Sequence, residues 1–216
     1  MSHRIIKTKR DVADGVAALV EACPHMREVH GRAGPPPLRR RPNGFPGLAR
    51  IVVGQQLSVA SASAIWERVA ALVTPFDPDV LLAQADEALR GAGLSAGKIR
   101  TLRTVSEALA AGDIDLKMLA KADDDEVRER LTALKGIGPW TADIYIMFCL
   151  GRADGWAPGD LALQLAVQDA VGLDARPTLA EMIDHAEPWR PWRSVAARML
   201  WAYYRVVRET SSDTPL

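Results

Sequence analysis

One stretch of this 216-residue chain combines residue types that could do chemistry: Leu134-Lys-Gly-Ile-Gly-Pro-Trp-Thr-Ala142. Gly136 and Gly138 leave the backbone uncovered by side chains and permit positive φ values. Backbone N–H groups in such a turn, together with the positive end of a helix that starts at Pro139, attract an anion such as phosphate. The pattern therefore predicts a phosphate-binding corner between two helices. A plain helix–turn–helix corner is the alternative.

The elements that must position this corner are predicted to be helices almost throughout. No run alternates with period two and is rich in β-branched residues, so we expect no sheet and an all-α fold. Capping residues and prolines are frequent, and residues 31–44, rich in proline and glycine, are expected to form a loop. The expected helices span 8–22, 46–55, 58–73, 79–90, 96–111, 116–120, 124–134, 139–150 and 161–171, with two more starting at 178 and 191.

The charge is balanced over the whole chain but not along it. The chain has 27 Lys and Arg against 27 Asp and Glu, which at first argues against a nucleic-acid partner. Residues 1–50, however, hold ten basic and four acidic residues, a net +6, whereas residues 51–130 have a net −4 and residues 131–216 a net −2. These blocks are either solvated faces or a local basic surface offset by acidic residues elsewhere.

Several classes of protein are excluded or disfavoured by composition. Two cysteines, Cys23 and Cys149, cannot supply a four-cysteine iron–sulfur cluster. No apolar run reaches the roughly 18 residues of a membrane span, and the basic N-terminus lacks the apolar core of a secretory signal. We therefore expect no membrane partner and a location in the cytoplasm (the bacterial nucleoid) or the nucleus, without secretion.

The glycine corner and three other landmarks resemble one protein family. Leu134–Ala142, the loop Gly151-Arg-Ala-Asp-Gly-Trp-Ala-Pro-Gly159 and Asp160 resemble the helix-hairpin-helix of the DNA glycosylase superfamily that includes endonuclease III. Three further segments resemble the 3-methyladenine DNA glycosylase II (alkylpurine DNA glycosylase) branch of that superfamily. In family order they are 47–58, 93–98 and 187–194, the last followed by Trp201. The resemblance spans roughly residues 34–205.

The resemblance implies a monofunctional enzyme that hydrolyses the N-glycosidic bond of alkylated purines in duplex DNA and so starts base excision repair. The damaged base would flip out of the helix, and Asp160 would stabilise an oxocarbenium-like sugar as the base leaves; Asp160 is also a helix N-cap candidate. Bifunctional members carry a lysine where this chain has Trp140, so no imine and no strand cleavage are expected. The alternatives are a glycosylase for deaminated or other damaged bases, and a non-catalytic helix-hairpin-helix module that only binds DNA.

The resemblance also assigns the remaining site residues. Trp140, Trp201, Tyr145 and Phe45 would form the base pocket. Lys135, Gly136, Gly138, Thr141, Gln55, Gln56 and Leu57 would contact DNA; the wedge that fills the gap is Gln56 if the alignment has no gap and Leu57 if it shifts by one. Hairpins of this family can hold a monovalent cation (Na⁺ or K⁺) through backbone carbonyls, here those of Thr132, Leu134 and Ile137, and no other cofactor is expected.

The expected architecture has two lobes. Residues 45–150 would form a helical bundle that contains the helix-hairpin-helix (124–150). Residues 1–44 and 151–216 would form a second, discontinuous lobe, with Asp160 at the mouth of a cleft between the two. We expect a monomer.

Overall fold

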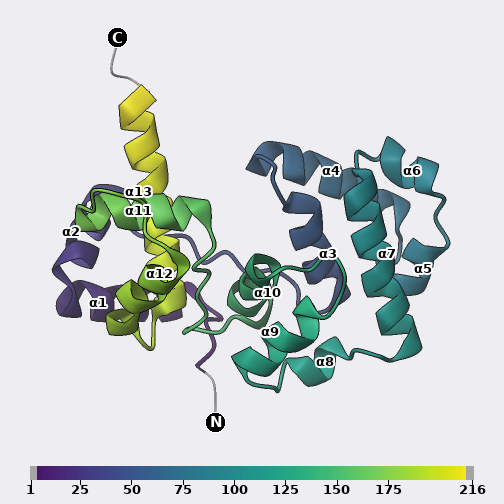
Figure 1. The fold of residues 1–216 in the computed structure, drawn as a ribbon, viewed down its shortest axis with the longest axis horizontal. Helices are drawn as coiled ribbons and strands as arrows, with labels where there is room; N and C mark the ends of the chain where they lie inside the picture. Colours follow the sequence, from purple (N-terminus) through teal and green to yellow (C-terminus); the bar gives the residue numbers. More distant parts are fainter. Residues whose placement is uncertain (1–3, 213–216) are drawn as a thin grey trace. The chain divides into compact units, whose positions relative to one another are not determined.

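The computed structural model describes residues 4–212, with side chains as far as Arg208, and this part of the chain is helical (Figure 1). Its only strand-like pairing is an isolated antiparallel bridge between Ile5 and Arg152. The all-α prediction is confirmed. No helix in the described range has both the length and the apolar composition that crossing a membrane requires.

The chain divides into two compact units, each described here by itself. Unit 1 comprises residues 1–40 and 151–216, and unit 2 comprises residues 41–150. A cleft between them stays a prediction.

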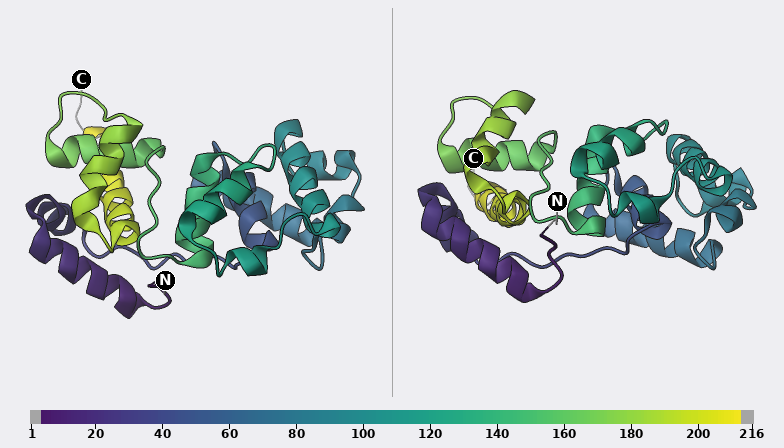
Figure 2. Two further views of the ribbon diagram at one scale, coloured as in Figure 1. Left: turned by 60° about the horizontal axis from the view of Figure 1, so that its bottom comes forward. Right: turned by 90° about the horizontal axis from the view of Figure 1, so that it is seen from below.

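Unit 1 is built around the long C-terminal helix. α13 packs against α1, α2 and α11, and α1 lies beside it in both views of Figure 2. Val195, Met199, Ala202 and Tyr203 share one face of α13 and are buried, whereas Val206 on the same face is half-buried. The helices of unit 1 are α1 (Lys9–Ala22), α2 (Pro24–Ala33), α11 (Leu161–Val171), α12 (Leu179–Ala186), a short 3₁₀ helix η2 (Glu187–Trp189) and α13 (Arg193–Ser212).

Unit 2 surrounds α3 and α10. α3 packs against α4, α7 and α10, and α9 packs against α10. Leu48, Ile51, Val52 and Val53 of α3 are almost completely buried, which is why this helix is so apolar. The helices of unit 2 are α3 (Phe45–Gly54), α4 (Val59–Leu72), α5 (Pro78–Leu82), α6 (Asp86–Gly91), α7 (Ala96–Ala111), α8 (Leu116–Leu119), α9 (Asp124–Thr132), α10 (Pro139–Tyr145) and the π-helical η1 (Ile146–Leu150).

Side-chain caps set most helix starts where the sequence predicts them. Thr8 and Thr178 form capping boxes with Asp11 and Glu181, and Ser95 accepts a hydrogen bond from the Lys98 N–H. Each cap satisfies an N–H group that the first helical turn leaves unpaired. The boundary of α9 differs slightly: Asp123, rather than Asp124, is its N-cap.

The helix expected over residues 79–90 is wrong, because the chain breaks it into α5 and α6. Arg103 of α7 reaches into the break, where its guanidinium donates to the carbonyl oxygens of Leu82 (3.1 Å) and Gln84 (2.6 Å) and to the carboxylate of Asp86 (2.8 Å). Because the arginine satisfies these acceptors, the backbone can leave the helix there.

The boundary between the units also differs from the expected one, since unit 2 starts at Arg41 rather than Phe45. The Arg41 N–H donates to the carbonyl of Phe148 at 3.0 Å, and Asn43 accepts the Tyr145 hydroxyl at 2.6 Å. The π-helical turn accompanies this contact: it replaces the end of the expected 139–150 α-helix, and the carbonyl of Phe148 lies within it.

Candidate active site

The loop that leads to Asp160 is held at its start by the first residues of the chain. The Ile6 N–H donates to the Gly151 carbonyl at 2.8 Å, and the Ala153 N–H donates to the Arg4 carbonyl at 2.9 Å. Gly151 has a φ of +75°, and a side chain at this position would collide with the guanidinium of Arg40. The loop therefore starts from a fixed backbone position.

Asp154 pins the middle of the same loop. Its carboxylate accepts hydrogen bonds from Arg193 at 2.9 Å on each oxygen and from Arg190 at 2.5 Å. Arg193 is largely buried, and it also donates to the Asp154 carbonyl at 3.1 Å. The 187–194 landmark thus supports the loop through Arg190 and Arg193. No signal in the sequence indicates that Asp154 is the residue they bind.

Two tryptophans hold the far end of the loop. The indole N–H of Trp156 donates to the Met182 carbonyl at 3.0 Å, and its ring meets Trp189 edge to face with centroids 5.5 Å apart. Both rings are buried. Gln164 of α11 donates to the Pro158 carbonyl at 2.9 Å, two residues before Asp160.

Asp160 is the N-cap of α11 and lies half-buried at the end of this loop. Its Oδ1 accepts the Leu163 N–H at 3.0 Å and the indole N–H of Trp201, also at 3.0 Å. Two donors from different elements therefore fix the orientation of the carboxylate. Trp201, expected as a wall of the base pocket, acts on Asp160 directly through its N–H group.

The turn of the hairpin uses its two glycines in different ways. Gly136 has a φ of +92°, and a Cβ there would lie 2.0 Å from Oγ1 of Thr101, so both conformation and space require glycine. Gly138 has a φ of −94°, and a Cβ there would meet nothing within 4 Å. Of the two glycines, only Gly136 uses a positive φ, and at Gly138 the missing side chain leaves the backbone uncovered.

An ion pair clamps the two helices of the hairpin together. Arg128 of α9 donates to the buried Asp143 of α10 at 3.0 Å and to Asp125 at 2.8 Å. Burial of Arg128 opposes its charge, but the two carboxylates outweigh burial and raise its pKa. The sequence places an acidic run at residues 123–126 without revealing this clamp.

Thr141 and Gln55, both expected to contact DNA, contact each other instead. Gln55 Nε2 donates to Thr141 Oγ1 at 2.9 Å, and Thr141 is only 2% exposed. Thr141 is therefore a support inside unit 2, and its side chain is not available to DNA in this conformation. The bond ties the end of α3 to α10.

The residues after Gln55 lie on the surface, as a wedge would require. Gln56 is exposed and adopts a left-handed conformation with φ +55°, which is uncommon for a residue other than glycine. Leu57 is 39% exposed. Both wedge alternatives stay open.

Two of the expected pocket residues are packed inside unit 2. Tyr145 has no exposed surface; its hydroxyl donates to Asn43 and accepts the Gly44 N–H at 3.1 Å, and burial raises its pKa above the usual range. Phe45 is 6% exposed and lies 5.4 Å from Phe76 between ring centroids. Their burial contradicts a role as open walls for a base, because neither presents a ring face to solvent.

Trp140 and Lys135 are partly or fully exposed on unit 2, and their roles stay predictions. Trp140 lies half-buried in the first turn of α10, and Lys135 is exposed immediately before the glycine turn. The Leu134 carbonyl accepts the Ile137 N–H at 3.0 Å and retains a second lone pair. The cation expected at Thr132, Leu134 and Ile137 stays a prediction.

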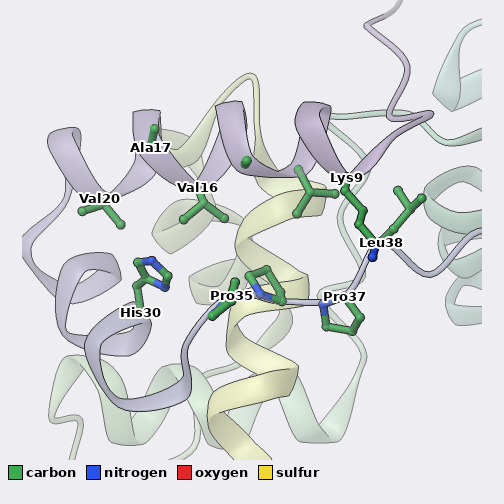
Figure 3. A pocket seen from close by; sticks show the side chains of 11 residues that line it. Lys9, Val16, Ala17, Val20, His30, Pro35, Pro37 and Leu38 are labelled. Atoms are coloured by element: carbon green, nitrogen blue, oxygen red, sulfur yellow. The ribbon is translucent and has the colours of Figure 1, made fainter.

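A separate hollow of about 640 Å³ lies on unit 1 between α1 and residues 35–38 (Figure 3). Its walls are mainly apolar, with Val16, Val20 and three prolines, and His30 and Lys9 at its edge. None of the residues that line it carries a carboxylate, so it lacks the group on which the expected chemistry depends.

The chain is similar to proteins named as 3-methyladenine DNA glycosylases. It is 32% identical over 172 residues to DNA-3-methyladenine glycosylase 1 of Schizosaccharomyces pombe, covering 78% of this chain and 75% of that protein. The structure of the S. pombe 3-methyladenine DNA glycosylase in complex with abasic DNA matches 87% of this chain and 95% of that chain, with a TM-score of 0.80 and 28% identity. A DNA-3-methyladenine glycosidase from Bacillus halodurans matches 97% of this chain and 95% of that chain, with a TM-score of 0.76 and 34% identity.

These similarities extend over most of the chain, and a family-wide comparison assigns residues 49–191 to one superfamily. That range includes the glycine turn, the loop from 151 to 159 and Asp160. The chain belongs to the HhH-GPD superfamily of base excision DNA repair proteins.

Proposed function

We propose that this protein is a monofunctional DNA glycosylase that hydrolyses the N-glycosidic bond of alkylated purines, of the 3-methyladenine type, in duplex DNA. The observation that carries the proposal is the Asp160 carboxylate, fixed by N–H groups of Leu163 and Trp201 at the end of a braced loop. The relatives named for 3-methyladenine support the class of substrate.

Asp160 would act on the sugar. As the bond to the base breaks, positive charge develops on the deoxyribose, and a carboxylate held close to it stabilises that charge. Because its orientation is already fixed, little reorganisation is needed during the reaction. The same carboxylate can orient the water that adds to the sugar.

The base needs less help from the protein. N-alkylation gives the purine a positive charge, so it leaves as a neutral molecule and no general acid is required. Stacking on an indole ring, the role predicted for Trp140 and for Trp201, would favour a cationic base that has left the DNA stack. The glycine turn would hold a backbone phosphate through N–H groups, with Gly138 leaving room for close approach.

The test is the variant Asp160→Asn, which keeps an N-cap but removes the negative charge. We expect it to abolish release of 3-methyladenine from alkylated duplex DNA, while binding to a duplex with an abasic-site analogue persists. Asp174→Asn, at an exposed aspartate of the same unit, is the matched control and should keep full activity. Full activity of Asp160→Asn would refute the mechanism.

The same assay separates the alternatives. Release of hypoxanthine or ethenoadenine in place of 3-methyladenine and 7-methylguanine would indicate a glycosylase for other lesions. Binding without release of any base would indicate a module that only binds DNA.

A further inference from the structure

A proline-rich segment of unit 1 is fastened across the C-terminal helix. We call residues 35–40 the proline strap; its first part is visible in Figure 3, where it crosses α13. Pro36 is buried, and Nε of Arg198 donates to the Leu38 carbonyl at 3.1 Å. Arg198 is 2% exposed and also donates to the Ser194 carbonyl at 2.6 Å. The strap is thus fixed to α13 directly before it reaches its arginines.

The strap presents Arg39 in a strained conformation. Its φ is +42°, in the left-handed region, which is unfavourable for an L-residue other than glycine. A strained residue persists when its surroundings fix it, and such residues cluster at functional sites. Here the surroundings are the stiff prolines and the Leu38 carbonyl held by Arg198.

Arg205 of α13 meets the strap at the same place. Arg39, Arg205 and Arg198 line one small hollow together with Trp201, whose indole N–H holds the Asp160 carboxylate. The hollow has no room for a water molecule, so a ligand would bind on its outer side, at the exposed ends of Arg39 and Arg205. Arg205 lies one helical turn after Trp201, so the two side chains leave α13 from the same side. The hollow therefore connects the strap with the residue that orients Asp160.

Three exposed arginines of this region form no ion pair among the described residues. Arg39, Arg40 and Arg205 are exposed, and within the described residues no carboxylate pairs with any of them. Burial, and then repulsion from Arg40 and Arg39, lowers the pKa of Arg198 to about 9. Burial and repulsion from Arg205 also lower the pKa of Arg39. An anion bound among these groups would relieve the repulsion.

We propose that the exposed guanidinium groups of Arg39 and Arg205 form an arginine cradle that binds a phosphate of the DNA backbone beside the damaged nucleotide. The inference rests on the proposed function, which supplies DNA as the ligand. Guanidinium groups bind phosphate oxygens in pairs and with geometric selectivity. Because Trp201 lines the same hollow and holds Asp160, the phosphate belongs to the strand whose nucleotide reaches that carboxylate.

The test compares Arg39→Gln and Arg205→Gln with Arg10→Gln, an exposed arginine of α1 that also has no carboxylate partner among the described residues. Fluorescence anisotropy would measure binding to a duplex with an abasic-site analogue over a range of NaCl concentrations. We expect each cradle variant to bind about threefold to tenfold more weakly. The slope of log Kobs against log salt should become shallower by about 0.9 for each lost charge.

Controls make the outcome decisive. Arg10→Gln should bind as the wild type does, and Arg39→Lys should recover part of the loss. Wild-type binding and salt slope in both cradle variants would overturn the proposal, and so would an equal loss in Arg10→Gln. Melting temperatures of all variants should equal that of the wild type. A lower melting temperature in the cradle variants that a charge-preserving substitution such as Arg39→Lys does not restore would show that the arginines serve stability, and would also overturn the proposal.

Two further measurements identify the source of the phosphate and separate this proposal from the proposed function. Millimolar inorganic phosphate, added at constant ionic strength, should not displace the duplex from the wild type; displacement that Arg39→Gln abolishes would indicate a free-phosphate site and overturn the DNA assignment. Single-turnover base release at saturating protein tests the function independently. A wild type that releases no alkylated purine, with cradle variants that lose DNA binding, would refute the function and leave the cradle supported.

Discussion

At the scale of single residues, Trp201 has a role that its type alone did not reveal. A tryptophan near a binding site is usually expected to stack on a ligand. Here the indole N–H donates to Asp160 at 3.0 Å, so the residue also orients the group expected to do the chemistry. The two roles can be separated, because phenylalanine retains a ring but has no N–H.

We predict that Trp201→Phe slows single-turnover release of 3-methyladenine about tenfold, since a hydrogen bond to a charged group contributes about 1.5–3 kcal/mol. Its affinity for a duplex with an abasic-site analogue should stay close to that of the wild type. Trp66→Phe is the control, because Trp66 packs on Phe76 within unit 2, with centroids 4.8 Å apart. A rate equal to the wild-type rate in Trp201→Phe would show that the hydrogen bond does not contribute to the reaction.

The residue at position 140 determines whether the protein can form a covalent imine with DNA. Trp140 has no amine, so it cannot form an imine with the abasic sugar. We predict that borohydride traps no covalent complex of this protein with DNA that contains an alkylated purine, under conditions that trap a bifunctional glycosylase. A trapped complex that disappears in Lys135→Gln would instead identify the exposed lysine beside the hairpin as a nucleophile.

At the scale of elements, the hairpin offers a matched pair of glycines. Gly136 is required by the fold, with φ +92° and Thr101 against it, whereas Gly138 has an ordinary φ and open space around its Cα. Alanine at each position therefore separates folding from ligand binding within a single turn.

We predict that Gly136→Ala lowers the free energy of unfolding by about 1–3 kcal/mol, because it forces an alanine into the left-handed region. Gly138→Ala should change the free energy of unfolding by less than about 0.5 kcal/mol, since a poorer N-cap and a less flexible unfolded chain nearly cancel. Gly138→Ala should nevertheless bind duplex DNA several-fold more weakly. Urea unfolding and anisotropy would measure the two effects, and undiminished binding by Gly138→Ala would contradict a backbone contact at this turn.

The elements also show what the sequence could predict. Helix starts can be predicted from the sequence because a cap is a local feature. Thr8, Ser95 and Asp160 each accept a hydrogen bond from the N–H group three residues later. The break between α5 and α6 could not be predicted, because it depends on Arg103, which lies about 20 residues further along the chain.

The candidate site divides in the same way. The family landmarks placed Asp160 at a helix N-terminus, where the structure has it. Other features of the site depend on segments far apart in sequence. They are the burial of Tyr145 and Phe45, the hydrogen bond between Gln55 and Thr141, and the salt bridges of Asp154. Such contacts are products of tertiary packing and leave no local pattern to read.

At the scale of the whole molecule, a net charge of zero hides an uneven distribution of charge along the chain. Backbone N–H groups at the hairpin bring no cationic charge, so charge neutralisation would come mainly from the arginine cradle. We predict a slope of log Kobs against log salt of about −1, the value for the single phosphate that the cradle would neutralise. Titrations of an undamaged duplex at several NaCl concentrations would measure it, and a slope steeper than about −3 would require basic contacts other than the cradle.

The division into a continuous unit 2 and a discontinuous unit 1 also has a consequence for biosynthesis. A ribosome completes all of unit 2 before the arginines that brace the Asp160 loop, Arg190 and Arg193, have been translated. Domains generally fold as units during synthesis, so the hairpin can form on the nascent chain while residues 1–40 wait for α13. A polypeptide released prematurely after unit 2 would carry the hairpin but not Asp160. Complete translation is therefore needed to combine DNA recognition by the hairpin with release of the base.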